Sequence, residues 1–137
     1  MFHRSGVGTR QRAGCDVIDI SLTTTPGCQL AVEYHHAAGG LMLSASHNPI
    51  EWNALKLIGA SGLFLEASEG AAMRLLMEQG TPYSSWDAIG SVTVDEGVAA
   101  RHIEAVLAIP YIDVEGIRAR RFKVALDCVR GAGATIM

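Results

Sequence analysis

The sequence predicts an α/β protein, with helices on both faces of a mostly parallel, mixed sheet in a three-layer α/β/α arrangement. Three observations lead to this class. Short apolar or β-branched runs alternate with helical patterns through the first half of the chain. A polar, turn-forming segment, residues 44–53, separates two apolar runs, as ligand-binding loops do at the carboxyl ends of strands. A chain of 137 residues is also long enough to bury one ordinary core without disulfides.

The first elements follow from local patterns. Residues 1–13 show no periodicity, so we expect an irregular segment there. Residues 15–20 predict a strand, because β-branched side chains alternate and a polar run follows. Thr25 as a cap, with proline next to it, predicts the start of a helix that two glycines end. Residues 41–43 then predict a buried strand that runs parallel to the first.

The later elements are predicted in the same way. The apolar run at residues 54–58 predicts another strand. Residues 68–79 and 96–108 predict helices, and residues 81–95 between them predict a surface connection. Asp113 is expected to cap a brief helix.

The domain organisation expected from these patterns has four parts. Phe122–Leu126 predicts a last strand with no helix after it, which is typical of the start of another domain. We therefore expect an irregular remnant, a first domain, a connector, and the first strand and loop of a truncated second domain, at residues 1–13, 14–110, 111–121 and 122–137.

Composition excludes several classes of function. Eleven basic residues against fourteen acidic residues, without a large basic cluster, argue against a nucleic-acid partner. No apolar run approaches the roughly 20 residues that span a bilayer, and no signal sequence is apparent. The three cysteines are far apart and predict neither a disulfide framework nor a zinc site. We expect a cytoplasmic protein that binds neither nucleic acid nor membrane.

The most distinctive segment is residues 46–49, Ser-His-Asn-Pro, which place a hydroxyl, an imidazole and an amide in one turn. Pro49 fixes the backbone and restricts Asn48 to an extended shape, so the loop can present Ser46 as a nucleophile. A serine hydrolase is not favoured, because there is no Gly-x-Ser-x-Gly elbow and adjacent Ser and His side chains pair poorly. From these residues alone, an asparagine-proline turn with an incidental serine is an equally good interpretation.

Residues 44–49, Ser-Ala-Ser-His-Asn-Pro, resemble the phosphoserine loop of the α-D-phosphohexomutases. The resemblance extends over about residues 14–70, including Asn-Ala-Leu-Lys-Leu at 53–57, and residues 122–133 resemble the opening strand of that family's second domain. It is strongest to a bacterial subgroup of phosphoglucosamine and phosphomannose mutases. The resemblance implies a fragment of an enzyme that interconverts hexose 1-phosphate and 6-phosphate through a phosphoserine and a sugar bisphosphate.

The resemblance also implies roles for particular residues. Ser46 matches the phosphoserine, which would also ligate Mg²⁺ through its phosphate. Lys56 matches a catalytic lysine that neutralises charge or assists proton transfer. His47 and Asn48 match positions that shape the loop and contact the phosphate of the substrate. The implied cofactors are Mg²⁺ and a hexose 1,6-bisphosphate activator.

The chain also departs from the family pattern. The glycine-rich opening, the Asp-x-Asp-x-Asp-Arg metal loop and the later sugar-reading and phosphate-binding loops are not recognisable, and Ala54 replaces a glycine. We therefore expect the isolated chain to be inactive. Its expected partners are a phosphosugar, the missing domains of its parent, and other copies of itself through an uncovered sheet edge.

Two alternatives from other classes stay open. Asp127–Thr135 place Gly-x-Gly after an expected strand, which is weakly typical of a Rossmann-like nucleotide-binding module. The third glycine and an acidic partner are absent from that pattern. The other alternative is a domain without catalytic activity that serves only in interaction.

Overall fold

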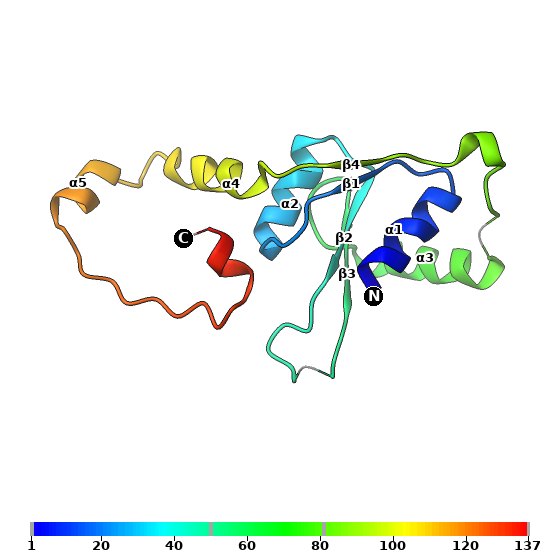
Figure 1. Ribbon diagram of the computed structural model, residues 1–137, viewed down its shortest axis with the longest axis horizontal. Coiled ribbons are helices and arrows are strands. Elements are labelled where there is room, and N and C mark those ends of the chain that lie inside the picture. The colour runs from blue at the N-terminus through cyan, green and yellow to red at the C-terminus, as the bar shows by residue number, and fades with distance from the viewer. Residues whose placement is uncertain (1, 50, 81, 137) are drawn as a thin grey trace.

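A computed structural model describes residues 2–49, 51–80 and 82–136 (Figure 1). The elements, in chain order, are α1 (Phe2–Arg12), β1 (Val17–Asp19), α2 (Thr25–Tyr34), β2 (Gly39–Leu43), β3 (Leu55–Gly59), α3 (Ala67–Gln79), η1 (Trp86–Ala88), β4 (Val92–Val94), α4 (Val98–Leu107), α5 (Val114–Ala119) and η2 (Ala132–Thr135), where η marks a short 3₁₀ helix.

The strands form two pairs. β1 pairs in parallel with β4, with Val17 opposite Val92, and β2 pairs antiparallel with β3, with Leu43 opposite Leu55. Helices flank these pairs, with α2 on one side and α1 and α3 on the other (Figure 1). The predicted α/β class is confirmed.

The predicted parallel pair between the first two strands is wrong. β2 pairs instead with the next strand along the chain, because residues 44–54 turn the chain back in a single loop, and β1 takes β4 as its parallel partner. A turn back at residues 63–65 bridges to the other edge of β3, where Ile58 lies opposite Phe64.

The irregular segment predicted for residues 1–13 is also wrong, since Phe2–Arg12 forms the helix α1. Thr9 Oγ1 donates to the carbonyl of Ser5 and Arg10 donates to that of Gly6, each four residues back within the helix. Tertiary contact with β1 also supports the helix, and such packing commonly outweighs weak local propensity.

The start of α2 differs by one residue from the prediction. Thr24, rather than Thr25, is the N-cap, and its hydroxyl accepts a hydrogen bond from the backbone N–H of Gly27. Pro26 lies in the first turn, where its missing N–H is not needed. Thr25 is thereby left free to use its own hydroxyl elsewhere.

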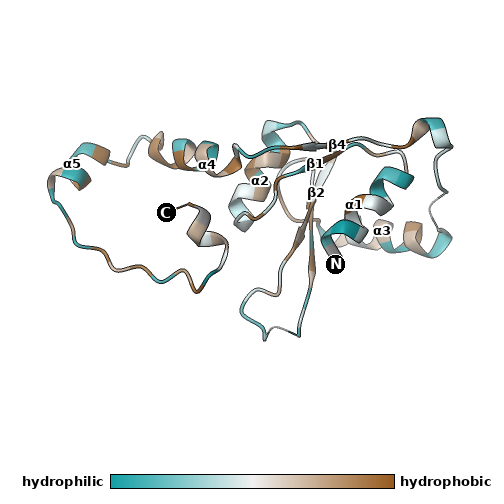
Figure 2. Ribbon diagram, in the orientation of Figure 1, coloured by the Kyte–Doolittle hydropathy of each residue, from teal (hydrophilic) through white to brown (hydrophobic). Residues whose placement is uncertain are grey.

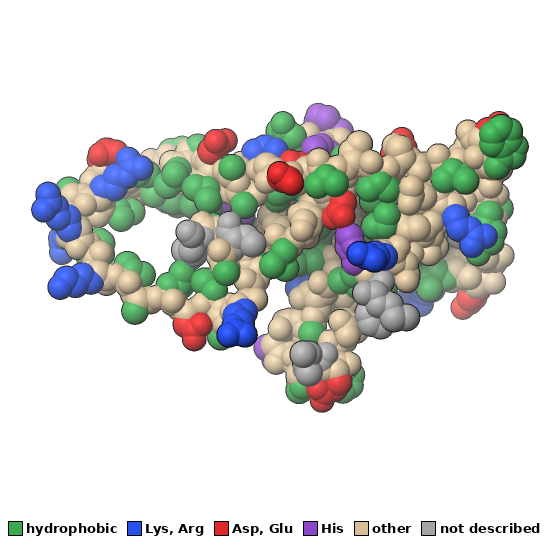
Figure 3. Space-filling model, viewed as in Figure 1, with side chains coloured by type: hydrophobic (Ala, Val, Ile, Leu, Met, Phe, Trp, Pro, Cys, Tyr) green, Lys and Arg blue, Asp and Glu red, His purple; other side chains and the backbone are tan. Residues whose placement is uncertain are grey.

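The core lies where α2 packs on the β2–β3 hairpin. Cys28, Val32 and Ile58 are buried there, and burial raises the pKa of the Cys28 thiol. Many large apolar side chains outside this cluster are exposed, including Trp86 and Tyr111, each 87% exposed. Figure 3 shows such side chains distributed across the visible face of the molecule. The core is therefore small for the length of the chain.

The second half of the chain is partly as predicted. The helix α4 falls inside the range predicted for it, and Asp113 caps α5 by accepting from the N–H of Gly116. β4 lies in residues 81–95, where only a surface connection was predicted. The strand predicted at Phe122–Leu126 is not formed, since residues 122–128 have no assigned element. None of the helices in the described part of the chain is long and apolar enough to cross a membrane.

Candidate functional site

The exposed loop between β2 and β3 is the candidate site. The strand register brings Leu43 opposite Leu55, and the backbone N–H of Ser44 donates to the carbonyl of Ala54, so the loop leaves and returns at one place. In Figure 1 it projects from the body of the molecule. The hairpin therefore carries the Ser-His-Asn-Pro segment to the surface.

Ser46 has an unusual backbone conformation within this loop. Its φ is +55°, in the left-handed region that favours glycine, and its side chain is exposed. A side chain there costs on the order of 1–2 kcal/mol. The N–H of Ser46 donates to Ser44 Oγ at 3.1 Å, and the N–H of Asn48 donates to the carbonyl of Ala45 at 3.0 Å, which holds the turn. Strained residues of this kind cluster at functional sites.

The side chains predicted to contact phosphate also lie in this loop. His47 Nδ1 lies 3.4 Å from Ser46 Oγ, a long contact whose donor depends on the imidazole tautomer. His47 and Asn48 are both exposed. A hydroxyl, an imidazole and an amide are thus accessible together to a ligand in solution.

Lys56 lies on β3, at the base of the hairpin. It is opposite Met42, and its Nζ donates to Thr25 Oγ1 at 3.2 Å instead of contacting Ser46. Lys56 lies two residues from Ala54, where the loop ends, a distance of about 7 Å along a strand. The structure therefore places the ammonium group of Lys56 beside the N-terminus of α2. From there a change of side-chain rotamer could bring it to the base of the loop.

The residues that the structure describes do not form a magnesium site by themselves. Mg²⁺ prefers octahedral oxygen ligation, commonly from carboxylates. Within residues 2–49, 51–80 and 82–136, no group of three or more His, Cys, Asp or Glu side chains is placed to hold a metal ion.

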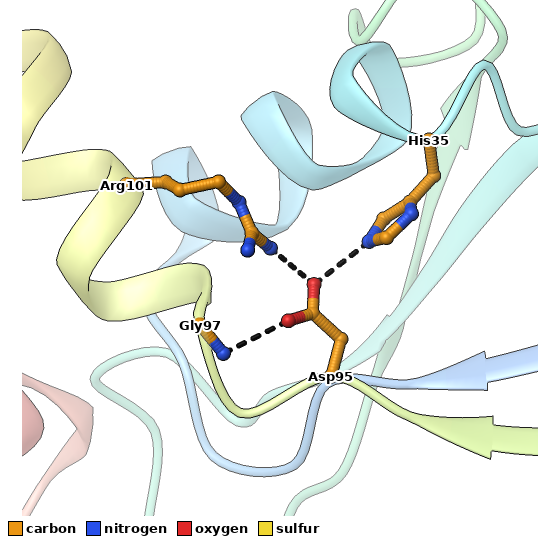
Figure 4. A network of polar contacts seen from close by, with 4 residues as sticks. All are labelled: His35, Asp95, Gly97 and Arg101. Atoms are coloured by element: carbon orange, nitrogen blue, oxygen red, sulfur yellow. Dashed lines mark hydrogen bonds and ion pairs between the residues drawn. The ribbon is translucent and has the colours of Figure 1, made fainter.

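A second polar cluster was not predicted from the sequence. Asp95, which follows β4, accepts hydrogen bonds from Arg101, from His35 Nε2 at 2.7 Å and from the N–H of Gly97 at 2.8 Å (Figure 4). The hydrogen bond from Arg101 is the main cause that lowers the pKa of Asp95 from 3.8 to about 2, although burial opposes it. We call these four residues the Asp95 cluster.

The Asp95 cluster joins elements rather than presenting a reactive group. His35 is the C-cap of α2, Gly97 is the N-cap of α4, and Asp95 bridges them. The Arg101 guanidinium also lies 4.1 Å from the centre of the Tyr34 ring. Lys56 contacts the opposite end of α2, about 15 Å away for a ten-residue helix. The cluster is therefore separate from the Ser46 loop.

The expected nucleotide-binding pattern near the C-terminus does not form a phosphate cradle. Residues 122–130 have no assigned strand, and residues 132–135 form a 3₁₀ helix of 4 residues. A dinucleotide-binding turn needs a strand before it and the N-terminus of an α-helix after it. The structure therefore gives this alternative no support.

Comparison with known proteins gives one family match. A family model described as "Phosphoglucomutase/phosphomannomutase, alpha/beta/alpha domain I" matches residues 1–84. The matched region contains α1, both strands of the hairpin and the loop with Ser46.

Curated relatives have corresponding names. A "Phosphoglucomutase/phosphomannomutase" of Thermococcus kodakarensis is 36% identical over 122 residues, covering 88% of this chain and 26% of the relative. A "Probable phosphoglucosamine mutase" of Methanopyrus kandleri is 34% identical, and the match covers 90% of this chain and 26% of the relative. A "Phosphoglucosamine mutase" of Lactobacillus acidophilus is 31% identical, and the match covers 90% of this chain and 27% of the relative. The chain thus spans about a quarter of the length of these relatives.

Proposed function

The chain belongs to the phosphoglucomutase/phosphomannomutase family, and on that premise we propose that Ser46 is the phosphoserine of a hexose-phosphate mutase. The observation that carries the proposal is the loop itself, which holds an exposed serine in a strained turn inside the matched region. The relatives are named as mutases of sugar phosphates, which supports the same reaction class for a complete enzyme that contains this chain.

In the proposed reaction, phosphorylated Ser46 donates its phosphoryl group to a free hydroxyl of a hexose monophosphate. The sugar oxygen forms a bond to phosphorus as the bond from phosphorus to Ser46 Oγ breaks, and the hydroxyl proton passes to the serine oxygen. The resulting sugar bisphosphate reorients, and its other phosphoryl group returns to Ser46. The products are the isomeric monophosphate and the phosphoserine.

The loop has features that suit this step. Phosphorylation adds about −1.5 to −2 charges at pH 7. Because Ser46 is exposed, that charge stays solvated until substrate arrives. Lys56 would have to release Thr25 and turn toward the base of the loop to help neutralise the charge. Phosphoryl transfer depends mainly on such positioning and electrostatic stabilisation.

His47 and Asn48 are proposed to bind phosphate rather than to act as bases. His47 Nδ1 lies 3.4 Å from Ser46 Oγ, so the imidazole is close enough to donate to a phosphoryl oxygen of phosphoserine. Mg²⁺ and a hexose 1,6-bisphosphate activator remain predictions for the complete enzyme, as do a phosphosugar substrate and a cytoplasmic location.

A chimera tests the proposal. The aligned quarter of the Thermococcus kodakarensis relative is replaced by this chain, and mutase turnover is measured with glucose 1-phosphate, mannose 1-phosphate and glucosamine 1-phosphate. Ser46→Ala in the chimera should abolish turnover while leaving its thermal unfolding unchanged, because an exposed loop serine contributes little packing energy. Ser68→Ala, which removes an exposed hydroxyl from α3 outside the loop, is the matched control and should retain activity. Undiminished turnover in the Ser46→Ala chimera would refute the assignment.

A further inference from the structure

The side chain of Ser44 contacts the strained backbone of Ser46. Among the described residues, the backbone of Ser46 makes one hydrogen bond, in which its N–H donates to Ser44 Oγ at 3.1 Å. The φ of +55° at Ser46 is disfavoured for a residue with a Cβ. Such a conformation persists only where the surrounding structure holds it, so the Ser44 hydroxyl is the group to consider first.

The same arrangement recurs in two other turns of this chain. Ser21, at a φ of +53°, donates its N–H to Asp19 Oδ1 at 2.8 Å. Val129, at a φ of +44°, donates its N–H to Asp127 Oδ1, also at 2.8 Å. Asp and Ser side chains can form this bond with the backbone two residues further on. The recurrence indicates that a side-chain oxygen at this spacing stabilises the left-handed conformation in this chain.

Ser44 is itself fixed by the hairpin that carries the loop. Its N–H donates to the carbonyl of Ala54 at 3.0 Å, directly after the last pair of the register, Leu43 and Leu55. Ser44 is half-buried, whereas Ser46 is exposed. Figure 2 shows the change from the hydrophobic ends of the strands to the more hydrophilic loop. The Ser44 hydroxyl therefore extends from the hydrogen-bonded end of the hairpin toward the loop.

We propose that Ser44 is a positioning residue, which holds Ser46 in the orientation required for phosphoryl transfer. The inference rests on the proposed role of Ser46 as the phosphoserine. The N–H of Asn48 donates to the carbonyl of Ala45 and closes the turn, but neither atom belongs to Ser46. The hydrogen bond to Ser44 therefore fixes the φ of Ser46, and with it the direction in which its Oγ leaves the backbone.

The direction of Ser46 Oγ matters because the attacking and leaving oxygens lie roughly in line during phosphoryl transfer. Without the Ser44 hydroxyl, φ would return from +55° to the negative values that residues with a Cβ prefer, and Oγ would leave that line. A misplacement of about 1 Å can lower a rate about 10²-fold. We therefore expect kcat to fall about 10-fold to 10²-fold with little change in KM, because alignment of the nucleophile is lost and substrate binding is not.

Two variants of nearly the same shape test this role in the chimera. Ser44→Val removes the hydroxyl, whereas Ser44→Thr keeps a hydroxyl on a side chain of matching size. The Ser44→Val chimera should show the loss in kcat, and the Ser44→Thr chimera should recover most of it. Thermal unfolding of both chimeras verifies that they are folded, and their common shape cancels effects of packing on turnover.

The second measurement reads the conformation of residue 46 without an activity assay. A residue with positive φ holds its amide hydrogen close to its own Hα, which gives a strong nuclear Overhauser effect between the two. In the 137-residue chain, this effect at Ser46 should be strong in the wild type and in Ser44→Thr, and weak in Ser44→Val. The same effect at Ser21 is the internal control and should be strong in all three, since Asp19 holds that turn.

The outcomes separate this inference from the proposed function. Equal turnover of the Ser44→Val and Ser44→Thr chimeras, whether retained or lost, would overturn the role of Ser44 even where Ser46→Ala abolishes activity. An unchanged Overhauser effect at Ser46 in Ser44→Val would overturn it as well. Turnover that survives Ser46→Ala would instead refute the proposed function.

Discussion

Replacing Asp95 by asparagine should destabilise the chain measurably. The carboxylate is 14% exposed and accepts hydrogen bonds from Arg101, His35 and Gly97, so an amide of the same shape leaves charged and polar donors with a weaker partner. The hydrogen bonds that weaken are those with which the Asp95 cluster connects α2, β4 and α4.

The size of the effect follows from the pKa of Asp95. A pKa lowered from 3.8 to about 2 corresponds to at most about 2.5 kcal/mol of stability at neutral pH. Arg101 and His35 are 29% and 23% exposed, so solvent screens part of the interaction. We therefore expect Asp95→Asn to lower the free energy of unfolding by about 1–2 kcal/mol at pH 7.

The effect should also depend on pH in a defined direction. Because the pKa of Asp95 is lower in the folded chain, its contribution is complete above pH 3.8 and is lost as pH falls toward about 2. Urea unfolding of the wild type and of Asp95→Asn should therefore differ at pH 7 and converge in acid. Asp127→Asn is the control, since Asp127 is exposed and, among the described residues, accepts only from the N–H of Val129. Equal stability of Asp95→Asn and the wild type at pH 7, or a difference that persists unchanged in acid, would refute the reasoning.

Three further substitutions have defined outcomes. Lys56→Ala in the chimera should lower turnover about 10²-fold to 10³-fold, as loss of an oxyanion donor does, and turnover at the level of the unsubstituted chimera would show that Lys56 takes no part. Gly40→Ala should lower the free energy of unfolding in urea by about 1–3 kcal/mol, because its Cβ would lie 2.7 Å from Val32 Cγ2 in the core. Unchanged stability would mean that Val32 moves to accommodate the added methyl group. Thr24→Ala should cost about 1 kcal/mol through loss of the helix cap, whereas Thr24→Ser should not; equal losses in both variants would argue against the cap.

The candidate loop was predictable because its signal is local. Residues 44–49 form one continuous motif, and the apolar runs on either side predict the strands that carry it. The left-handed backbone of Ser46 was not predictable, because glycine is the residue type whose presence commonly indicates such a conformation. The contact of Lys56 with Thr25 also depends on how α2 packs against the hairpin.

The elements that sequence patterns missed depend on tertiary contacts. β4 has only three residues, all exposed, and is recognisable only by its pairing with β1. α1 contains Gly6 and Gly8, which lower its helix propensity, and its sequence shows no helical periodicity of apolar residues. In the Asp95 cluster, His35 and Asp95 are 60 positions apart, so only the folded chain brings them together.

The paired strands were predicted correctly as segments but not as partners. The runs at residues 41–43 and 54–58 correspond to β2 and β3, yet their antiparallel pairing leaves β1 without the neighbour expected for it. The strand predicted at Phe122–Leu126 has the right residues for a strand but pairs with no other strand in the part of the chain that the structure describes. Strand propensity indicates which residues suit a sheet, whereas pairing depends on which other strand is available.

Isolated chain and chimera should differ in turnover. The described residues do not form a metal site, and Lys56 does not contact Ser46, so the isolated chain should show no measurable mutase activity with any of the three sugar phosphates. A single phosphoryl transfer to Ser46 requires one event per molecule and can accumulate during long incubation even when turnover is not measurable.

The most direct measurement is therefore the covalent state of Ser46. The isolated chain is incubated with glucose 1,6-bisphosphate and Mg²⁺, and its intact mass and peptide map are compared with those of Ser46→Ala. The account predicts one added phosphoryl group, located on Ser46 and absent from the variant. An unmodified wild-type chain, or a phosphoryl group on another residue that persists in Ser46→Ala, would contradict it.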